Sequence, residues 1–266
     1  MTEPVVLTAT AGGVCTITMN RPKALNALNR ELTLALRDAV FAAEQNKDVR
    51  CVVLKGGEHF MAGGDLKWFH DQLGKFSPGE IKPMFETFIH EVHAMIISIR
   101  RMPKPVIASV SGAAAGFGLS LALACDLTIA ADTSYFTLAY SLIGVTPDGG
   151  STYSLARLVG AKKAAEIAML ADRFDAAAAE RLGLVNKVVP AAELDAQTAK
   201  LAARLAAGPT AVYGRTKALL QRSLDNPLEA QLQREAEAFS QSATEPDFAE
   251  GIRAFIEKRK PNFKGS

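Results

Sequence analysis

The stretch that decides the fold reads PKPVIASVSGAAAGFGLSLALACDLTIAA, from Pro103 to Ala131. Its apolar segments predict a short strand (Val106 to Val110), a small-residue loop, a helix and a second strand (Leu127 to Ala131). The loop from Gly112 to Gly118 has almost no side chains and leads straight into the helix. Backbone N–H groups at a helix start have no intrahelical acceptor, and the helix dipole adds partial positive charge there. Two interpretations stay open: an anion or oxyanion site, and a tightly packed strand–helix junction.

A second stretch of the same design lies upstream. The apolar run from Cys51 to Leu54 is typical of a strand buried on both faces, and the loop from Gly56 to Lys67 leads into another predicted helix. Each loop can present a backbone N–H group, near Ala62 and near Phe117. A converging pair of amides stabilises an enolate or a tetrahedral oxyanion, and one such donor is worth roughly 3 kcal/mol in a dry site. The sequence leaves open whether the loops converge.

Strands alternate with helices as far as Pro190, which predicts an α/β fold with mainly parallel strands. Apolar spacing predicts helices over Arg30 to Gln45 and Pro83 to Arg101. Between them, the polar, Gly/Pro-containing segment from Asp71 to Pro83 is expected to be a mobile loop. From Ala191 onward the chain becomes helical. We therefore expect a core over residues 1–190 and a helical oligomerisation region over residues 191–266, which cannot bury itself alone and should pack on the core or on another subunit.

Composition narrows the class of protein. The chain has 266 residues, of which 48% are hydrophobic and 22% charged, as in a globular domain. A net charge of +2 argues against a nucleic-acid partner, and no apolar run is long enough to cross a membrane. The N-terminus lacks a signal-peptide pattern, and three cysteines without metal-ligand spacing are typical of reduced core residues. We expect a cytoplasmic protein with no metal site and neither a nucleic-acid nor a membrane partner.

Several motifs together resemble the enoyl-CoA hydratase/isomerase (crotonase) family. They follow the family's order and cover nearly the whole chain: Asn20 to Leu28, Phe60 to Lys67, Pro103 to Ala108, Gly112 to Asp126, Ala178 to Val185 and Phe255 to Pro261. The resemblance implies a crotonase-like spiral of ββα turns with a C-terminal helical trimerisation region. It also implies an acyl-CoA thioester as substrate, a homotrimer or dimer of trimers, and no cofactor beyond the coenzyme A that is part of the substrate.

The resemblance assigns roles to individual positions. Ala62 and Phe117 match the two oxyanion-hole positions. Backbone contacts to CoA fall on Lys23, Ala24 and Leu25, and adenine-end contacts from a neighbouring subunit fall on Phe255 and Lys258. The other positions expected around bound substrate are Met61, Gly63, Gly64, Asp65, Leu66, Gly116, Ser120 and Tyr140. Asp65 and Asp126 themselves are typical of helix caps or hydrogen-bonding anchors.

The sequence departs from the family where hydratases carry two catalytic glutamates, because Ser120 and Tyr140 occupy those positions. Adding water across a double bond uses two carboxylates, so plain hydration is doubtful. Asp148 stands instead in a turn before a helix and resembles the single acidic residue of enoyl-CoA Δ-isomerases and ring-epoxide phenylacetyl-CoA isomerases. The segment from Thr152 to Gly160 also resembles 4-chlorobenzoyl-CoA dehalogenase, where the matching Asp is a nucleophile. Without the family, the Asp-Gly-Gly turn favours an ordinary helix-capping role for Asp148.

We therefore predict an acyl-CoA isomerase that converts 3-enoyl-CoA to 2-enoyl-CoA or a ring analogue. Asp148 takes a proton from C2 and returns it at C4, while the N–H groups of Ala62 and Phe117 hold the enolate oxygen. Three alternatives stay open: an enoyl-CoA hydratase, a dehalogenase or thioester hydrolase with Asp148 as nucleophile or base, and a non-catalytic CoA-binding protein.

Other candidate side chains are assigned to structure rather than chemistry. His90 and His93 are expected at solvated or edge positions of their helix. His59 precedes the first loop and is a candidate for ligand contact. Trp68 and Phe69 are candidates, with Phe117, to shape an acyl pocket, although core packing is the default for an aromatic side chain.

Overall fold

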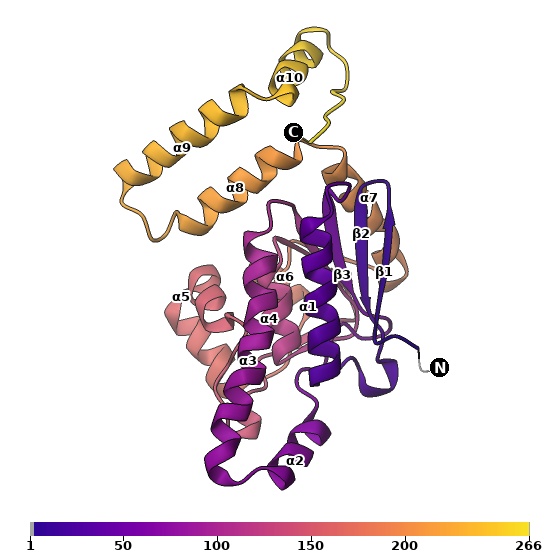
Figure 1. Ribbon diagram of the computed structural model, residues 1–266, viewed down its shortest axis with the longest axis vertical. Coiled ribbons are helices and arrows are strands. Elements are labelled where there is room, and N and C mark those ends of the chain that lie inside the picture. Colours follow the sequence, from indigo (N-terminus) through magenta and orange to yellow (C-terminus); the bar gives the residue numbers. More distant parts are fainter. Residues whose placement is uncertain (1–2, 266) are drawn as a thin grey trace.

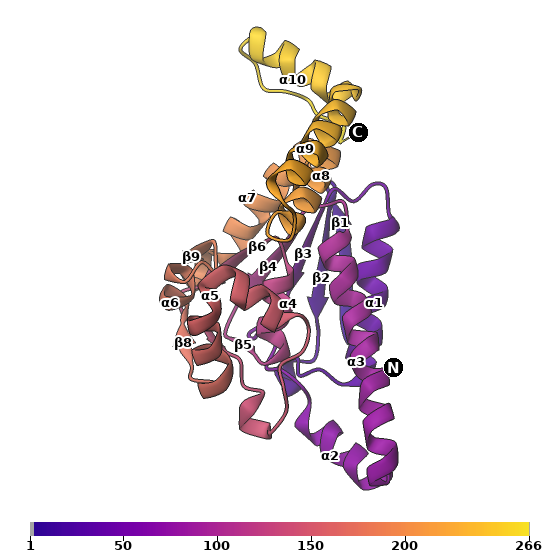
Figure 2. The same cartoon turned by 90° about the vertical axis from the view of Figure 1, so that its left-hand side faces the viewer.

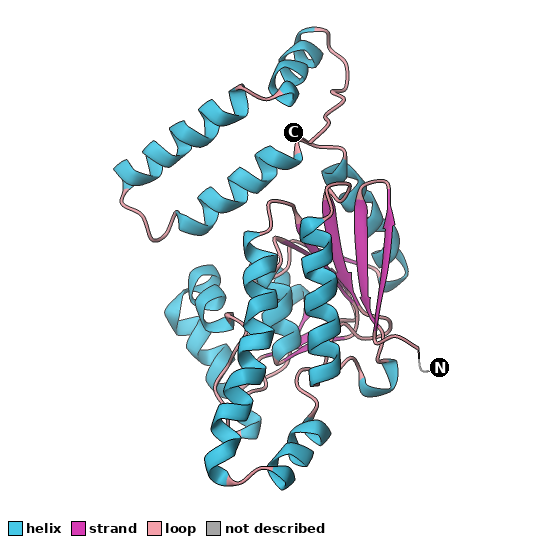
Figure 3. Ribbon diagram, viewed as in Figure 1, coloured by secondary structure: helices cyan, strands magenta, loops and turns pink. Residues whose placement is uncertain are grey.

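A six-stranded sheet forms the centre of the molecule, in a computed structural model that describes residues 3–265 (Figure 1, Figure 3). Within this sheet the first two strands pair antiparallel, and the other neighbouring strands pair in parallel. In spatial order the strands are β1 (Val6–Ala11), β2 (Val14–Met19), β3 (Cys51–Lys55), β4 (Val106–Val110), β6 (Leu127–Ala131) and β9 (Lys187–Val189). A smaller sheet contains β5 (Ala113–Ala115), β7 (Tyr135–Thr137) and β8 (Phe174–Asp175).

The chain repeats one structural unit as it winds through the two sheets. β4 lies in the large sheet, β5 in the small sheet, and α4 (Phe117–Ala124) follows. β6, β7 and α5 (Ser151–Leu170) repeat this order. The preceding unit has the same form, since after β3 a single residue, Met61, pairs in parallel with Ala114 of β5. The result is a spiral of strand–strand–helix turns.

Helices cover both faces of the large sheet (Figure 1, Figure 2). On one face, α1 (Arg30–Gln45) and α3 (Pro78–Arg101) pack against side chains that include Val52 and Leu54. On the other, α7 (Leu194–Ala206) packs against Cys51 and Val53. The prediction that β3 is buried on both faces is confirmed.

The prediction of a mobile loop from Asp71 to Pro83 is wrong. α2 (Leu66–Lys75) and the first turns of α3 occupy it. A capping box supplies the reason, because the Ser77 N–H and hydroxyl both donate to the Glu80 carboxylate, at 3.0 and 2.6 Å. Pro78 occupies the start of the helix, where a missing N–H costs nothing. Of the two prolines that suggest a loop in the sequence, Pro78 thus marks a helix start, whereas Pro83 lies inside α3.

Beyond β9 the described chain is helical, as predicted. Short helices η1 (Pro22–Ala24), η2 (Ser141–Ile143) and η3 (Ala191–Glu193) and the helix α6 (Ala176–Arg181) lie in the core region. α8 (Thr210–Arg222), α9 (Leu228–Ala243) and α10 (Pro246–Ile256) extend away from the large sheet (Figure 2). These three helices and the connection between α8 and α9 leave several large apolar side chains exposed, among them Leu220, Leu224, Leu228, Leu232, Phe239 and Phe255. No helix within residues 3–265 has the length and apolarity to cross a membrane.

Candidate active site

The two small-residue loops meet. The Met61 N–H donates to the Ala113 carbonyl and the Ala115 N–H donates to the Met61 carbonyl, both at 2.9 Å. Gly118 makes this approach possible, because a Cβ on it would lie 2.2 Å from the Met61 carbonyl oxygen. The question that the sequence leaves open is therefore answered by backbone pairing between the loops.

Ala62 is not the free donor that the sequence predicts. Its N–H donates to the Leu25 carbonyl at 3.0 Å. An amide already paired with a backbone oxygen has no hydrogen to offer a substrate, since each N–H donates one proton. The assignment of Ala62 as an oxyanion donor is therefore corrected: Ala62 holds the loop to the chain segment around Leu25.

The N–H group of Gly64 is a free donor in this loop. The Gly63 carbonyl accepts from the Leu28 N–H at 2.7 Å, and the Gly63–Gly64 peptide bond is trans, so the Gly64 N–H points away from Leu28. Gly63 lies against Gly116, on which a Cβ would stand 3.5 Å from the Gly63 Cα. Within residues 3–265, neither the Gly64 N–H nor the Phe117 N–H has a backbone acceptor. Two unpaired amides thus flank the contact between Gly63 and Gly116.

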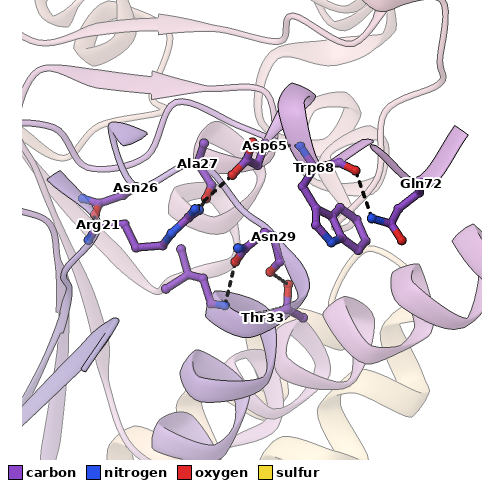
Figure 4. Close-up of polar contacts among 9 residues, drawn as sticks. Arg21, Asn26, Ala27, Asn29, Thr33, Asp65, Trp68 and Gln72 are labelled. Atoms are coloured by element: carbon purple, nitrogen blue, oxygen red, sulfur yellow. Dashed lines mark hydrogen bonds and ion pairs between the residues drawn. The ribbon is translucent and has the colours of Figure 1, made fainter. Parts of the chain in front are cut away.

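A polar network fixes the first loop (Figure 4). The Arg21 guanidinium contacts the Asp65 carboxylate at 3.0 Å and donates to the Ala27 carbonyl. Asp65 also accepts from the Trp68 N–H at 3.2 Å and so caps α2, which confirms the predicted cap. The buried Asn26 amide donates to the carbonyls of His59 and Phe60, at 2.7 and 3.2 Å. These contacts hold the loop that carries Gly64.

The predicted CoA-contacting segment lies beside this loop. Lys23 and Ala24 belong to η1, and Leu25 follows in the left-handed region with φ of 52°. The Lys23 side chain is exposed, and Leu25 is 43% exposed. Leu66, the first residue of α2, is also exposed. Backbone and side chains of this segment are therefore accessible next to the free Gly64 amide.

The turn that carries Asp148 lies on the start of α4. A Cβ on Gly149 would stand 2.8 Å from the Phe117 ring and 2.9 Å from the Ser120 Cβ, and its φ is +62°. Only glycine combines that backbone conformation with so close an approach. The Asp148 turn is therefore in direct contact with the first turn of the helix whose N-terminal amide is unpaired.

Ser120, Tyr140 and Asp148 form a chain of hydrogen bonds. The Tyr140 hydroxyl donates to the Asp148 carboxylate, and the Ser120 hydroxyl lies 3.1 Å from the Tyr140 oxygen. Because the single tyrosine proton goes to Asp148, Ser120 is the donor to Tyr140. Ser120 and Tyr140 are both buried. The two positions that lack the hydratase glutamates thus support the carboxylate of Asp148.

Burial raises the pKa of Asp148 above its ordinary value. The hydrogen bond from Tyr140 and the nearby His93 imidazole oppose this rise without cancelling it. Burial also raises the pKa of Tyr140, and the adjacent Asp148 carboxylate adds to the rise. The tyrosine therefore stays protonated as a donor, and Asp148 is the member of the chain that can exchange a proton.

The helix-cap interpretation of Asp148 does not hold. α5 has Gly150 at its N-cap position and no side-chain cap hydrogen bond. Ser151 bonds to the backbone carbonyl of Asp148 rather than to its carboxylate. The carboxylate of this half-buried residue instead accepts a hydrogen bond from Tyr140, so it does not cap α5.

His93 is the site residue that sequence reasoning missed. Its Nε2 accepts from the Gly149 N–H at 3.3 Å, directly beside Asp148. The expected edge position is right, since His93 is half-buried while His90 is exposed. The missed signal is its spacing, four residues after Ile89 and three before Ile96, which places it at the apolar face of α3.

The remaining candidates have structural positions. The Ala113 N–H donates to His59 Nδ1 at 3.1 Å, which ties the two loops together. Trp68 stacks against Phe88, with ring centroids 4.8 Å apart, so α2 packs on α3 through aromatic side chains. Phe255 is 87% exposed on α10, at the end of the molecule opposite α2 (Figure 1). One chain therefore does not bring Phe255 or the neighbouring Lys258 to the loops.

Comparison with known proteins places this arrangement in a family. Residues 9–266 match the family model described as "Enoyl-CoA hydratase/isomerase". The chain belongs to the enoyl-CoA hydratase/isomerase family. It is 38% identical over 260 residues, 95% of each chain, to a protein of Rhodobacter capsulatus named probable enoyl-CoA hydratase. It is also 34% identical over 98% of each chain to the 1,2-epoxyphenylacetyl-CoA isomerase of Escherichia coli.

Relatives of this family differ in the reaction their names give. A 4-chlorobenzoyl coenzyme A dehalogenase of an Arthrobacter species is 33% identical over 92% of this chain and 88% of its own length. The crystal structure of an enoyl-CoA hydratase from Polaromonas sp. JS666 superposes with a TM-score of 0.91 at 37% identity, covering 97% of this chain and 99% of that one. The expected α/β crotonase-like spiral with a helical C-terminal region is thereby confirmed.

Proposed function

We propose that this member of the enoyl-CoA hydratase/isomerase family is an acyl-CoA isomerase that shifts a double bond through an enolate. Its substrate is a 3-enoyl-CoA or a ring analogue, and its product is the conjugated 2-enoyl-CoA. The observation that carries the proposal is the half-buried carboxylate of Asp148, whose turn contacts Phe117 and Ser120 at the start of α4, next to the unpaired Phe117 amide. Hydration of a double bond uses two carboxylates. The two positions where hydratases carry catalytic glutamates hold Ser120 and Tyr140 in this chain.

The thioester oxygen binds between the N–H groups of Gly64 and Phe117. Both donors are backbone groups on rigid elements, so they need no reorganisation when negative charge develops on that oxygen. The positive end of the α4 dipole lies at the Phe117 amide and adds to this stabilisation. The acidity of the C2 proton rises because the resulting dienolate is held by these donors.

Asp148 then moves one proton. Its carboxylate removes a proton from C2, and the carboxylic acid that forms returns the proton at C4, which leaves the double bond between C2 and C3. A raised pKa suits both steps, because a base and its conjugate acid exchange protons best when the pKa approaches the working pH. Tyr140 holds the carboxylate in place and remains protonated throughout.

The CoA part of the substrate lies along Lys23, Ala24 and Leu25. We also propose a homotrimer or dimer of trimers, in which a neighbouring subunit supplies Phe255 and Lys258 to the adenine end of CoA. The exposed apolar side chains of α8, α9 and α10 support this assembly, since they are the surfaces that a second chain would cover. No separate cofactor is needed.

The test compares wild type with Asp148→Asn on 3-enoyl-CoA, crotonyl-CoA and an aryl-CoA thioester. The asparagine still accepts the Tyr140 hydrogen bond but cannot carry a proton, so kcat for the 3-enoyl substrate should fall by about 10³-fold or more. The dissociation constant of the substrate should change little. Undiminished isomerisation by Asp148→Asn would refute the assignment, and efficient hydration of crotonyl-CoA by wild type would favour a hydratase.

His93 favours one second candidate, a dehalogenase or thioester hydrolase. In a dehalogenation the Asp148 carboxylate attacks the ring carbon that carries the halogen, halide leaves, and the imidazole beside it activates the water that hydrolyses the resulting aspartyl ester. In a thioester hydrolysis Asp148 acts as a base on water, and the CoA thiolate leaves. Single-turnover reactions in H₂¹⁸O decide between the two. Isomerisation puts no ¹⁸O into the product, whereas hydrolysis of an aspartyl ester places label in the Asp148 carboxyl group.

A further inference from the structure

Asn26 is a fully hydrogen-bonded polar side chain in the core that the proposed reaction does not use. It is 1% exposed. Its Oδ1 accepts from the Arg21 N–H at 2.8 Å, and its Nδ2 donates to the carbonyls of His59 and Phe60, at 2.7 and 3.2 Å (Figure 4). Gly56 packs on the same amide, since a Cβ there would stand 2.7 Å from Nδ2. Because carbonyls only accept and a backbone N–H only donates, only an amide satisfies all three partners.

The turn over residues 21–28 is closed by a reciprocal pair. The Arg21 N–H donates to the Asn26 side chain, and the Asn26 N–H donates to the Arg21 carbonyl at 3.0 Å. Leu25 and Asn26 both lie in the left-handed region, with φ of 52° and 55°. A leucine persists in that conformation only where surrounding contacts hold it. The reciprocal pair therefore holds the strained turn that presents Lys23 and Leu25.

This turn is paired with the first loop on either side of the buried amide. The Leu25 carbonyl accepts from the Ala62 N–H at 3.0 Å, and the Leu28 N–H donates to the Gly63 carbonyl at 2.7 Å. The second bond orients the peptide that ends in the Gly64 N–H, because the carbonyl and N–H of a trans peptide point in opposite directions. The position of the turn therefore fixes the direction of that N–H.

We infer that Asn26 is a positioning residue, which sets the direction of the Gly64 N–H by holding the turn over residues 21–28 against the first loop. The inference rests on the proposed function, which gives that N–H the thioester oxygen as its acceptor. Stabilisation of an oxyanion depends on donors that are already in place, so a loosened loop polarises the carbonyl less. One side chain thus links the segment expected to contact CoA, Lys23 to Leu25, to a donor at the reacting carbonyl.

The stretching frequency of a bound thioester carbonyl tests this role without turnover. Butyryl-CoA labelled with ¹³C at the carbonyl is bound at saturation to the Asp148→Asn protein, which lacks the proposed base, and difference infrared spectra are recorded. Donation from the Gly64 and Phe117 N–H groups should lower the frequency relative to free butyryl-CoA. Adding Asn26→Asp places an acceptor against two carbonyls, so this protein should keep less than about half of the shift.

A second variant and a matched control complete the series. Asn26→Gly removes the three side-chain hydrogen bonds and should also reduce the shift, while glycine adopts the left-handed conformation without strain. The control is Asn29→Ala, also in the Asp148→Asn background. Asn29 is half-buried in the same segment, and its side chain accepts from the Leu32 N–H at 2.9 Å as the N-cap of α1. Its loss should lower Tm and leave the carbonyl frequency unchanged.

Kinetics give an independent readout. With Asp148 intact, Asn26→Asp should lower kcat for 3-enoyl-CoA by about 10²-fold, the effect of losing one oxyanion donor. Asn29→Ala should leave kcat unchanged.

The outcomes separate this inference from the proposed reaction. A full carbonyl shift in both Asn26 variants would overturn the positioning role and leave the reaction untouched. An equal loss of the shift in Asn29→Ala would also overturn it, since general loosening of the fold would then explain the change. A shift that depends on Asn26 in a protein that does not isomerise 3-enoyl-CoA would support the positioning role and refute the proposed function. No shift in the parent Asp148→Asn protein would refute both.

Discussion

Two aspartates at opposite ends of α4, Asp126 and Asp148, show how one residue type serves two purposes. Burial raises the pKa of both carboxyl groups. Asp126 accepts from the Lys217 ammonium at 2.7 Å and from the Val106 N–H at 2.8 Å, so a fixed cation and a backbone donor hold it. Asp148 has a neutral tyrosine hydroxyl as its strong partner.

The difference lies in the charge of the partner. The charges of a carboxylate and a buried ammonium balance each other, so protonating the carboxylate would leave the ammonium charge without a counter-charge. A carboxylate beside a hydroxyl keeps its hydrogen bond when it gains or loses a proton. Asp126 therefore anchors α8 to the core, and Asp148 is suited to proton transfer.

Breaking the Asp126 pair should give the largest change in stability. Lys217→Met leaves the Asp126 carboxylate without its cation and removes the hydrogen bond to the Ile99 carbonyl at 2.6 Å. The free energy of unfolding should fall by about 3 kcal/mol at pH 7, measured by urea denaturation. The loss should shrink as pH falls, because protonated Asp126 no longer needs the cation. Lys200→Met, an exposed change on α7, should cost little, and an equal loss there would contradict the anchor role.

Neutralising Asp148 should raise the stability of the fold, whereas breaking the Asp126 pair lowers it. The pKa of Asp148 in the folded protein lies above the unfolded value of 3.8, so its favourable contribution exists at low pH and is lost as pH rises through the folded pKa. Asp148→Asn should therefore raise Tm at pH 8 by about 2 °C or more, with the gain vanishing near pH 4. Differential scanning calorimetry at both pH values measures this. A lower Tm at pH 8 would mean that the charge stabilises the fold.

Tyr140→Phe tests the hydroxyl partner. Without that hydrogen bond the pKa of Asp148 should rise further, because a donor to the charged form lowers the pKa. The acid limb of kcat/KM should move upward by about one pH unit, while the plateau above it stays within about tenfold of wild type. Ser120→Ala is the control, since it does not touch Asp148 directly. An unmoved acid limb would show that Asp148 is not the titrating base.

His93 should give the smallest effect on isomerisation. His93→Gln keeps an acceptor for the Gly149 N–H, so turnover of 3-enoyl-CoA should stay within about threefold of wild type. His93→Ala removes the acceptor and should cost more, through the position of the Asp148 turn. A loss of more than about a hundredfold in His93→Gln would move the assignment toward the hydrolytic candidate.

Sequence reasoning succeeded where a local pattern carries the information. The spacing of apolar residues and the residue types at the ends of each segment predicted α1, β4 and β6 with their observed bounds. It failed at Asp71 to Pro83, where Pro78 at the start of α3 and Pro83 inside it were interpreted as signs of a loop. β1 was also missed, because five of its six residues are exposed and show no alternation of burial.

The free amide shows most clearly what a sequence does not contain. The motif from Phe60 to Lys67 located the first loop, yet it pointed to Ala62 rather than Gly64. The Ala62 N–H is paired because it donates to the Leu25 carbonyl, and the Gly64 N–H is free because the Gly63 carbonyl is turned toward the Leu28 N–H. Leu25 and Leu28 lie far from this loop along the sequence. The same holds for His93, whose partner Gly149 belongs to another turn of the spiral.

The sequence by itself determined α1, β4, β6 and the small-residue loops, which follow from residue type and spacing over a few residues. The resemblance to the family added the absence of both hydratase glutamates and the place of Asp148. Only the tertiary structure decided that the loops pair, that Ser120 and Tyr140 serve Asp148, and that His93 contacts the Asp148 turn. Those relations depend on distances between segments that the chain brings together only when its apolar faces are buried.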